Sequence, residues 1–371
     1  MAVEFLYLDE PDMVKAGVLD VKRCVKTLDE MFCLMGKRDY LMGNPGENSH
    51  GIMLWFPNEK RTEQMPVAGP DRRFMAMPAF LGGRFNVCGV KWYGSNMENK
   101  QKGLPRSILT VMLNDVDTGA PIALMSANLL SSIRTGSVPG VATKYLQKKN
   151  AGVVGVVGAG VIGRSSLMAI AETIDQKQEV RVYDISPKKA AAFCAEMRVS
   201  LDIEIHPVSK LEEAVRGCNV VSVAAAGAVP VNLKDEWIEP GTLIIATGAV
   251  DLSRGCIRNS RVVFDNWKMH EEWLDEMRRF PELRGNLCSG HPSESILTML
   301  QDGALAQTEM LSLGDIIVNP GLGRVSDDET IIFFTGGMGI EDVAWGKDIY
   351  DEAVRQRIGK KMSLWNTPHW T

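Results

Sequence analysis

The distribution of apolar residues divides the chain into two parts with different periodicity. Up to about residue 126, short apolar runs between turn sequences predict an antiparallel or mixed sheet, and the spacing of apolar residues from Val21 to Met35 predicts an amphipathic helix. From Ala151 onward, strands alternate with helical segments, which is typical of a parallel sheet covered by helices. The first part is expected to contain strands at 4–8, 52–56, 74–80, 87–93, 107–113 and 121–125, then a helix at 127–146. The second part is expected to contain strands at 153–157, 180–183, 203–206, 220–224, 243–248 and 261–265.

A glycine-rich turn joins the first strand and the first helix of the second part. It comprises Gly158, Ala159, Gly160, Val161, Ile162 and Gly163. The next strand ends on Asp184. This arrangement matches the dinucleotide-binding fingerprint, in which two glycines let the backbone approach a pyrophosphate, the third lets helix pack on strand, and the acid binds the ribose hydroxyls. The sequence therefore predicts a Rossmann-type domain that binds a nicotinamide dinucleotide.

The residues around this turn favour NAD over NADP. A carboxylate at Asp184 would repel the 2′-phosphate of NADP, whereas Arg164, Lys188 and Lys189 lie close by in the sequence and keep NADP open as the alternative. Strand ends of such a sheet face the ligand. Three further residues are therefore expected in the cofactor site, namely Ala225, Thr247 and Gly248.

Composition and charge exclude several classes of protein. The 371 residues carry a formal net charge of −5, so they lack the basic field that nucleic-acid binding needs. The first residues include acids where a signal peptide would carry lysine or arginine, and no apolar run reaches the roughly 18 residues of a membrane span. The seven cysteines form no CxxC pair, as expected of free thiols in a reducing compartment. We therefore expect a cytoplasmic protein that binds neither nucleic acid nor membrane.

The spacing of the histidines argues against a metal centre. The five histidines form neither an HxH nor an HExxH motif, so we expect no bound metal. We expect His206, His270 and His291 to lie at the surface or in loops.

Several segments resemble the ornithine cyclodeaminase/mu-crystallin family in the same order. They are GVKWYGSN, GLPRS, LNDVDTGAP, SSIRTG, VVGAGVIG, ATGAVD and GRVSDDETIIFFTGGMGIEDVAWG, within a likeness from about Phe74 to Ala344. The resemblance implies a nucleotide-binding domain embedded between an N-terminal sheet domain and a C-terminal return to it, with the sheet domain forming a homodimer. The expected fold is α/β, with a Rossmann-type parallel sheet domain plus an α+β antiparallel or mixed-sheet domain for dimerisation and substrate binding. The expected boundaries are 1–130, 131–325 and 326–371.

The resemblance also implies hydride transfer at a carbon that bears nitrogen. In the cyclodeaminase cycle, L-ornithine gives its Cα hydride to bound NAD+, its distal amine attacks the resulting iminium, ammonia leaves, and the hydride returns to form L-proline. The alternatives are an imine or ketimine reductase, an amino-acid dehydrogenase, or an opine-type enzyme. A further alternative is a crystallin-like protein that keeps the fold and cofactor without turnover. The enzymes of this set act on a small amino acid or imine.

The resemblance maps a clamp for the substrate carboxylate onto four residues, Arg61, Lys91, Ser107 and Arg134. A guanidinium binds a carboxylate bidentately, and a lysine adds a point charge. Lys91 is also a catalytic candidate, and its alternative role is a strand-end charge that faces water. Arg72 or Arg73 is the alternative to Arg61, because the likeness passes through a loop there.

Two positions bear on how the substrate nitrogen is handled. Asp251 follows the strand at 243–248, and the resemblance implies that it exchanges protons with the amine, while an N-cap of the following turn is the alternative. Met75 stands where ornithine cyclodeaminases carry a glutamate, which argues against cyclisation. The insert at 96–102 is similar to that of members that reduce imines or make opine-like secondary amines.

The segment from Glu341 to Trp345 resembles the family's C-terminal segment that closes over the cofactor. The alternative is a helix that packs against the Rossmann-type sheet.

Overall fold

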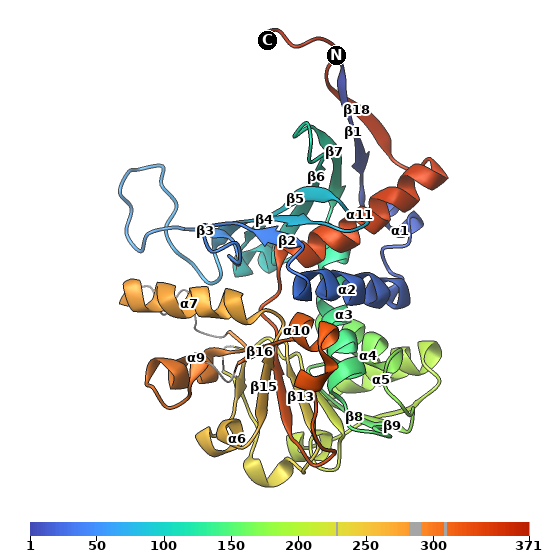
Figure 1. Cartoon of the computed structure of the whole chain (residues 1–371), viewed down its shortest axis with the longest axis vertical. Helices are drawn as coiled ribbons and strands as arrows, with labels where there is room; N and C mark the ends of the chain where they lie inside the picture. The colour runs from blue at the N-terminus through green and yellow to red at the C-terminus, as the bar shows by residue number, and fades with distance from the viewer. Residues whose placement is uncertain (228, 282–290, 308–309, 371) are drawn as a thin grey trace. The chain divides into compact units, whose positions relative to one another are not determined.

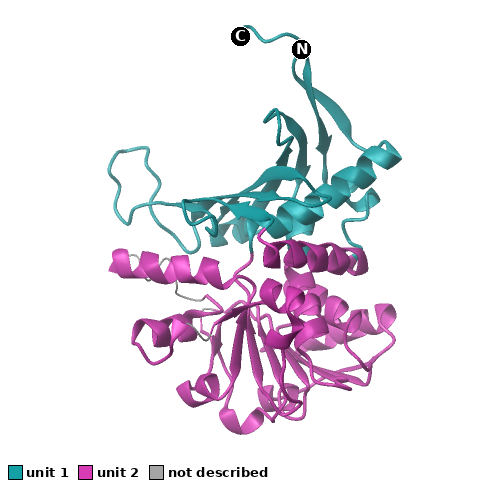
Figure 2. Cartoon of the chain, in the orientation of Figure 1, with its two compact units in different colours: residues 1–20, 39–134, 338–371 teal, residues 21–38, 135–337 magenta. Residues whose placement is uncertain are grey.

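The computed structural model describes residues 1–370 except 228, 282–290 and 308–309. The chain forms two compact units (Figure 2). Unit 1 comprises Met1–Asp20, Asp39–Arg134 and Met338–Thr371, and unit 2 comprises Val21–Arg38 and Thr135–Gly337.

Unit 1 contains a mixed eight-stranded sheet in the order β18-β1-β7-β6-β5-β4-β2, with β3 also paired to β4 (Figure 1). Its strands are β1 (Val3–Leu8), β2 (Tyr40–Met42), β3 (Ile52–Trp55), β4 (Arg73–Leu81), β5 (Val87–Ser95), β6 (Ser107–Asn114), β7 (Pro121–Ser126) and β18 (Lys360–Trp365). Strands β1 and β7 run parallel, and the neighbours from β7 to β4 run antiparallel. Side chains alternate along β4, where Met75, Met77 and Leu81 are buried. The predicted mixed sheet is confirmed.

The helix α11 (Gly339–Gln356) packs on β4, β5 and β6 of this sheet. A Cβ atom on Gly89 would lie 2.9 Å from a methyl group of Val343, so the glycine lets strand and helix approach closely. The alternative in which the segment from Glu341 packs against the parallel sheet is therefore wrong, while closure of this segment over the cofactor stays a prediction. Two shorter elements belong to unit 1, α1 (Glu10–Lys15) and the 3₁₀ helix η1 (Met97–Lys102), and α3 (Asn128–Leu146) begins in unit 1 and continues in unit 2.

Unit 2 contains a parallel eight-stranded sheet in the order β10-β9-β8-β11-β13-β17-β15-β16. Its strands are β8 (Val153–Val157), β9 (Glu179–Tyr183), β10 (Glu204–Pro207), β11 (Val220–Val223), β13 (Leu243–Ala246), β15 (Arg261–Phe264), β16 (Leu311–Ser312) and β17 (Ile331–Phe334). A separate parallel pair is formed by β12 (Val231–Asn232) and β14 (Val250–Asp251). Every residue of β11, β13 and β17 is buried, which explains why these strands consist of apolar residues apart from Ser222 in β11. The predicted Rossmann-type sheet is confirmed.

Helices connect and flank these strands, as Figure 1 shows for α4 and α5 beside β8 and β9. The helices are α2 (Val21–Gly36), α4 (Val161–Ala171), α5 (Pro187–Ser200), α6 (Arg254–Arg258), α7 (Trp267–Arg279), α9 (Glu294–Gln301) and α10 (Leu313–Val318), with 3₁₀ turns η2 (Leu211–Ala214), η3 (Asp235–Trp237) and η6 (Pro320–Leu322). Within the described part of the chain, each helix is too short or too polar to cross a membrane.

Three segments fall differently from the expected division, and the shortest is residues 131–134, expected in the second domain but part of unit 1. Residues 21–38, expected in the first domain, group with unit 2 because α2 packs on α10, where a Cβ atom on Gly36 would lie 2.2 Å from the Gly314 carbonyl oxygen. Residues 326–337, expected in the C-terminal segment, include β17, which pairs with both β13 and β15. The chain returns to unit 1 at Met338.

Candidate functional site

The glycine turn between β8 and α4 has the geometry of a phosphate-binding loop. Gly158 has φ of +106°, which favours glycine, and its N–H donates to the Tyr183 carbonyl at 2.8 Å. A Cβ atom on Gly163 would lie 2.1 Å from the Gly158 carbonyl oxygen, so the third glycine allows α4 to pack on the turn. A Cβ atom on Gly160 would meet no atom within 4 Å. The turn is therefore tight on one side and open at Gly160, where α4 begins and Val161 is 60% exposed.

Asp184 directly follows β9 and stabilises this turn through hydrogen bonds. Its Oδ2 accepts a hydrogen bond from the Ala159 N–H at 2.9 Å, and its Oδ1 accepts one from the Ser186 N–H at 2.9 Å. Each carboxylate oxygen has a second lone pair, so the side chain keeps acceptor capacity for a ligand hydroxyl.

The expected residues at the neighbouring strand ends lie beside the turn. A Cβ atom on Gly158 would lie 2.7 Å from the Ala225 nitrogen, and one on Gly248 would lie 2.4 Å from the Ala225 carbonyl oxygen. The Thr247 hydroxyl donates to the Val223 carbonyl at 2.9 Å. The structure therefore brings the ends of β8, β11 and β13 together at one edge of the parallel sheet.

A buried cluster of four charged side chains lies within unit 1, and we call it the charged quartet: Lys91, Arg134, Glu341 and Asp342. Lys91 and Arg134 are 4% exposed and the two carboxylates are 0% exposed. The Oδ2 atom of Asp342 lies 3.0 Å from the Nζ of Lys91 and 3.0 Å from an Nη of Arg134, and Glu341 pairs with the other Nη of Arg134. The structure thus brings two of the predicted clamp residues to one carboxylate. The alternative that Lys91 faces water is wrong.

Burial changes the acid–base properties of the two cations. Burial, with a smaller contribution from Arg134, lowers the pKa of Lys91 to about 8, although Asp342 and Glu341 oppose the shift. Burial alone would lower the pKa of Arg134, but the two carboxylates outweigh it and hold that pKa above its usual value. Lys91 can therefore exchange a proton near neutral pH, whereas Arg134 remains a cation.

Met75 lies on the same sheet as Lys91, and Tyr93 links the two. Met75 is fully buried and stands opposite Tyr93 across β4 and β5. The Tyr93 hydroxyl donates to the Met75 sulfur at 3.1 Å, and the Nζ of Lys91 lies 5.6 Å from the centre of the Tyr93 ring. A thioether therefore occupies the place of the carboxylate expected in an ornithine cyclodeaminase.

The other predicted clamp residues lie outside the charged quartet. The Ser107 hydroxyl donates to Ser95 at 3.0 Å, and Ser95 in turn bonds to Asp71. Arg73 and Arg106 also pair with Asp71, while Arg72 donates to the Val67 carbonyl at 3.1 Å. Arg61 is exposed. Ser107 therefore belongs to a second polar cluster on β5 and β6, and its role and that of Arg61 stay predictions.

Asp251 lies in unit 2 on the two-stranded pair. Its side chain is exposed and accepts a hydrogen bond from the Asn232 amide at 2.7 Å. It lines a cavity of about 550 Å³ together with Asn232 and His291. Its alternative role as an N-cap is wrong, because Ser253 caps α6 and accepts from the Cys256 N–H at 2.9 Å.

His270 is not at the surface, contrary to expectation. It is 0% exposed on α7, where its Nε2 lies 3.0 Å from Asp265 and its Nδ1 lies 3.1 Å from the Ser293 hydroxyl. Burial alone would raise the pKa of Asp265, but the hydrogen bond and charge of His270 and nearby backbone N–H groups hold it below its usual value. Asp265 also accepts the N–H groups of Gly336 and Gly337, at 2.7 and 3.2 Å. The described residues contain no cluster that could hold a metal ion.

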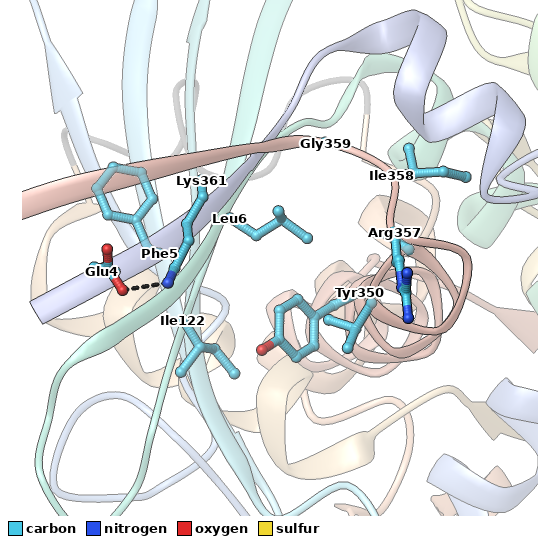
Figure 3. Close-up of a pocket in the computed structure, with 11 residues that line it drawn as sticks. Glu4, Phe5, Leu6, Ile122, Tyr350, Arg357, Ile358, Gly359 and Lys361 are labelled. Carbon is cyan, nitrogen blue, oxygen red and sulfur yellow. Dashed lines mark ion pairs between the residues drawn. The ribbon is translucent and has the colours of Figure 1, made fainter.

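A further cavity in unit 1 lies between β1, β18 and α11 (Figure 3). It has a volume of about 460 Å³, and Leu6, Ile122 and Tyr350 contribute to its lining. Glu4 and Lys361 beside it form an ion pair. The lining is largely apolar and includes none of the four side chains of the charged quartet.

The sequence alone did not identify Glu341 and Asp342 as partners of the clamp. The available signal was their acidic dipeptide in a segment with an otherwise apolar pattern, since buried carboxylates require cationic partners.

Comparison with known proteins gives consistent matches over most of the chain. The sequence model of the ornithine cyclodeaminase/mu-crystallin family matches residues 18–357. Alanine dehydrogenase from Archaeoglobus fulgidus is 31% identical, over 78% of this chain and 83% of that protein. N-((2S)-2-amino-2-carboxyethyl)-L-glutamate dehydrogenase from Staphylococcus aureus is 28% identical, over 98% of this chain and 99% of that protein. The solved structure of Δ1-pyrroline-2-carboxylate reductase from Thermococcus litoralis, in complex with NADH and L-proline, is 27% identical with a TM-score of 0.77, over 96% of this chain and 99% of that one.

Proposed function

The chain belongs to the ornithine cyclodeaminase/mu-crystallin family, and from this membership we propose that it is an NAD-dependent dehydrogenase or imine reductase acting on the Cα–N bond of an α-amino acid. In one direction, the Cα hydride passes to NAD+ and an imine forms. In the other, NADH reduces an imine to the amine. We place this activity ahead of the cyclodeamination of L-ornithine to L-proline. We also expect the enzyme to be a homodimer.

The observation that carries the proposal is the buried pair of cations on a sheet that lacks the cyclodeaminase carboxylate. Lys91 and Arg134 offer a carboxylate one point charge and one planar guanidinium. Met75 cannot ionise, so it cannot take a proton from the distal amine of ornithine or from a water. The absence of this carboxylate therefore favours net oxidation or reduction at Cα over the cyclisation that releases ammonia.

The turn between β8 and α4 fits NAD. The space at Gly160 and the free N–H groups at the start of α4 suit a pyrophosphate, and Asp184 keeps acceptor capacity for ribose hydroxyls. Bound NAD would supply the hydride acceptor, and NADH the donor. The relative from Thermococcus litoralis holds NADH, which supports the same cofactor here.

Residues of the chain itself would bind the substrate and exchange protons with it. Arg134 stays charged and would bind the substrate carboxylate. Lys91, with a pKa of about 8, would accept a proton from the substrate ammonium during oxidation and return it during reduction. Asp251 is proposed as a second proton-exchange group, because its exposed carboxylate lines a cavity.

The activity can be tested with purified protein and a panel of substrates. NAD+ with L-alanine, L-proline and L-ornithine would be followed by the absorbance of NADH and by ammonia and proline release, and NADH with cyclic imines would be followed in reverse. Stoichiometric formation or consumption of NADH supports the proposal. Proline and ammonia from ornithine without net NADH would contradict it and establish cyclodeamination.

A second candidate substrate class is the secondary amine of an opine-type compound. The relative from Staphylococcus aureus, a dehydrogenase of an N-substituted glutamate, matches almost the whole of both chains. If this class is correct, NADH will form from N-(carboxyalkyl) amino acids and the product will be a 2-oxo acid plus a primary amine.

A further inference from the structure

We infer that Asp342 binds the amino nitrogen of the substrate, so that the charged quartet selects zwitterionic α-amino acids over their deaminated carboxylates. This inference rests on the proposed function, because it assigns the nitrogen of the substrate whose carboxylate Arg134 binds.

The first argument is the balance of charge. With Lys91 protonated, the charged quartet holds two positive and two negative side chains, all of them buried. A carboxylate that entered alone would leave this buried site with a net negative charge, which is costly away from water. A zwitterion brings an ammonium with its carboxylate and leaves the balance unchanged.

The second argument is two buried hydrogen-bonding atoms of the charged quartet, one on Asp342 and one on Arg134. Among the described residues, the Oδ1 of Asp342 and the Nε of Arg134 are buried atoms without a hydrogen-bond partner. Buried polar groups are nearly always paired, so such atoms indicate partners that arrive with a ligand. One is an acceptor and the other a donor, which matches the ammonium and the carboxylate of an α-amino acid.

The third argument is how firmly Asp342 is placed. Its other oxygen, Oδ2, bridges Lys91 and Arg134 at 3.0 Å each. Asp342 lies in the first turn of α11. A Cβ atom on Gly339 would lie 2.6 Å from the Met77 carbonyl oxygen, so this helix begins in close contact with β4. The free oxygen is thus held beside the two cations rather than on a mobile side chain.

This assignment concerns binding of the ammonium and is separate from the proton exchange proposed for Asp251. Asp251 is exposed, and one of its oxygens is occupied by Asn232 at 2.7 Å. An exposed carboxylate is solvated by water and gains little by binding an ammonium, whereas a buried one lacking a partner gains more.

The test compares binding of an amino acid with binding of its α-deaminated analogue. Calorimetric titrations of the full chain saturated with NADH would use L-alanine against propionate and L-ornithine against 5-aminopentanoate. The wild type is expected to bind the amino acid at least about tenfold more tightly than its analogue. In Asp342→Asn, amino-acid affinity should fall to that of the analogue, whose own affinity should hold or increase.

Two matched variants on the same helix separate a specific effect from a general one. Glu341→Gln removes a neighbouring carboxylate that pairs with Arg134, and it should change the affinities of both members of a pair alike. Asp351→Asn removes a half-exposed partner of Lys347 and should change neither. Asp342→Glu should restore part of the preference for the amino acid.

Two outcomes would overturn the inference and leave the proposed function standing: equal affinity of the wild type for an amino acid and its analogue, or an equal loss of both in Asp342→Asn. The first needs no variant, so it decides the matter even if Asp342→Asn fails to fold. If the wild type bound neither member of any pair and produced no NADH from the panel, the proposed function itself would fail.

Discussion

Replacing Lys91 with arginine would keep its charge and remove its ability to exchange a proton near neutral pH. Burial lowers the pKa of Lys91 to about 8, so its neutral and charged forms coexist at that pH. An arginine stays protonated in proteins. Its guanidinium can still pair with Asp342, whose carboxylate lies 3.0 Å from the lysine Nζ. The substitution therefore separates the charge of this side chain from its proposed acid–base role.

The size of the effect follows from the loss of one positioned acid–base group, which costs about 10²- to 10⁴-fold in rate. The direction of the pH dependence follows from which form of Lys91 is needed. Oxidation of an amino acid needs the neutral lysine, so wild-type kcat/KM should rise with pH through about 8, and imine reduction should fall through the same pH. In Lys91→Arg both transitions should disappear.

The assay is steady-state kinetics of NADH formation and consumption between about pH 6 and pH 10, with thermal unfolding as the control for folding. Lys91→Met, which removes the charge as well, should lose substrate affinity in addition to rate. A Lys91→Arg enzyme with wild-type kcat and an unchanged pH transition near 8 would refute the assignment of Lys91 as the acid–base group.

Three further predictions concern stability and the second acid. From pH 8 to pH 10.5, the free energy of unfolding of the wild type should rise by about 3 kcal/mol relative to that of Lys91→Met. In this range Lys91 keeps its proton in the unfolded chain and has lost it in the folded one. A difference between the two proteins that stays constant with pH in urea titrations would contradict this. Gly163→Ala should lower the free energy of unfolding by about 1–3 kcal/mol, because its Cβ atom would lie 2.1 Å from the Gly158 carbonyl oxygen. Gly160→Ala is its control, since it should leave urea unfolding unchanged and weaken NADH binding in a fluorescence titration, and equal stability losses would refute the comparison. Asp251→Asn should lower kcat by about 10²- to 10⁴-fold without changing the melting temperature, and full activity would rule out its proton-exchange role.

The sequence by itself determined the parallel unit and its cofactor turn, because both depend on local pattern. Buried strands are almost continuous apolar runs, and three glycines between a strand and a helix have few alternatives to a tight turn. The short strands of unit 1 were predicted for a similar reason, since alternation along a strand such as β4 reflects one buried face.

Tertiary structure alone decided which charged side chains meet. Lys91 and Asp342 are 251 positions apart in the sequence, and Arg134 and Glu341 are 207 apart, so no local spacing connects them. The sequence around His270 does not show which residues surround it in the fold, so its burial could not be predicted. It is buried because the face of α7 that carries it packs inward. Burial lowers the pKa of Lys91 and leaves one oxygen of Asp342 without a hydrogen-bond partner. Burial is a property of the folded chain as a whole, so the chemistry of this site could not be derived from the sequence pattern.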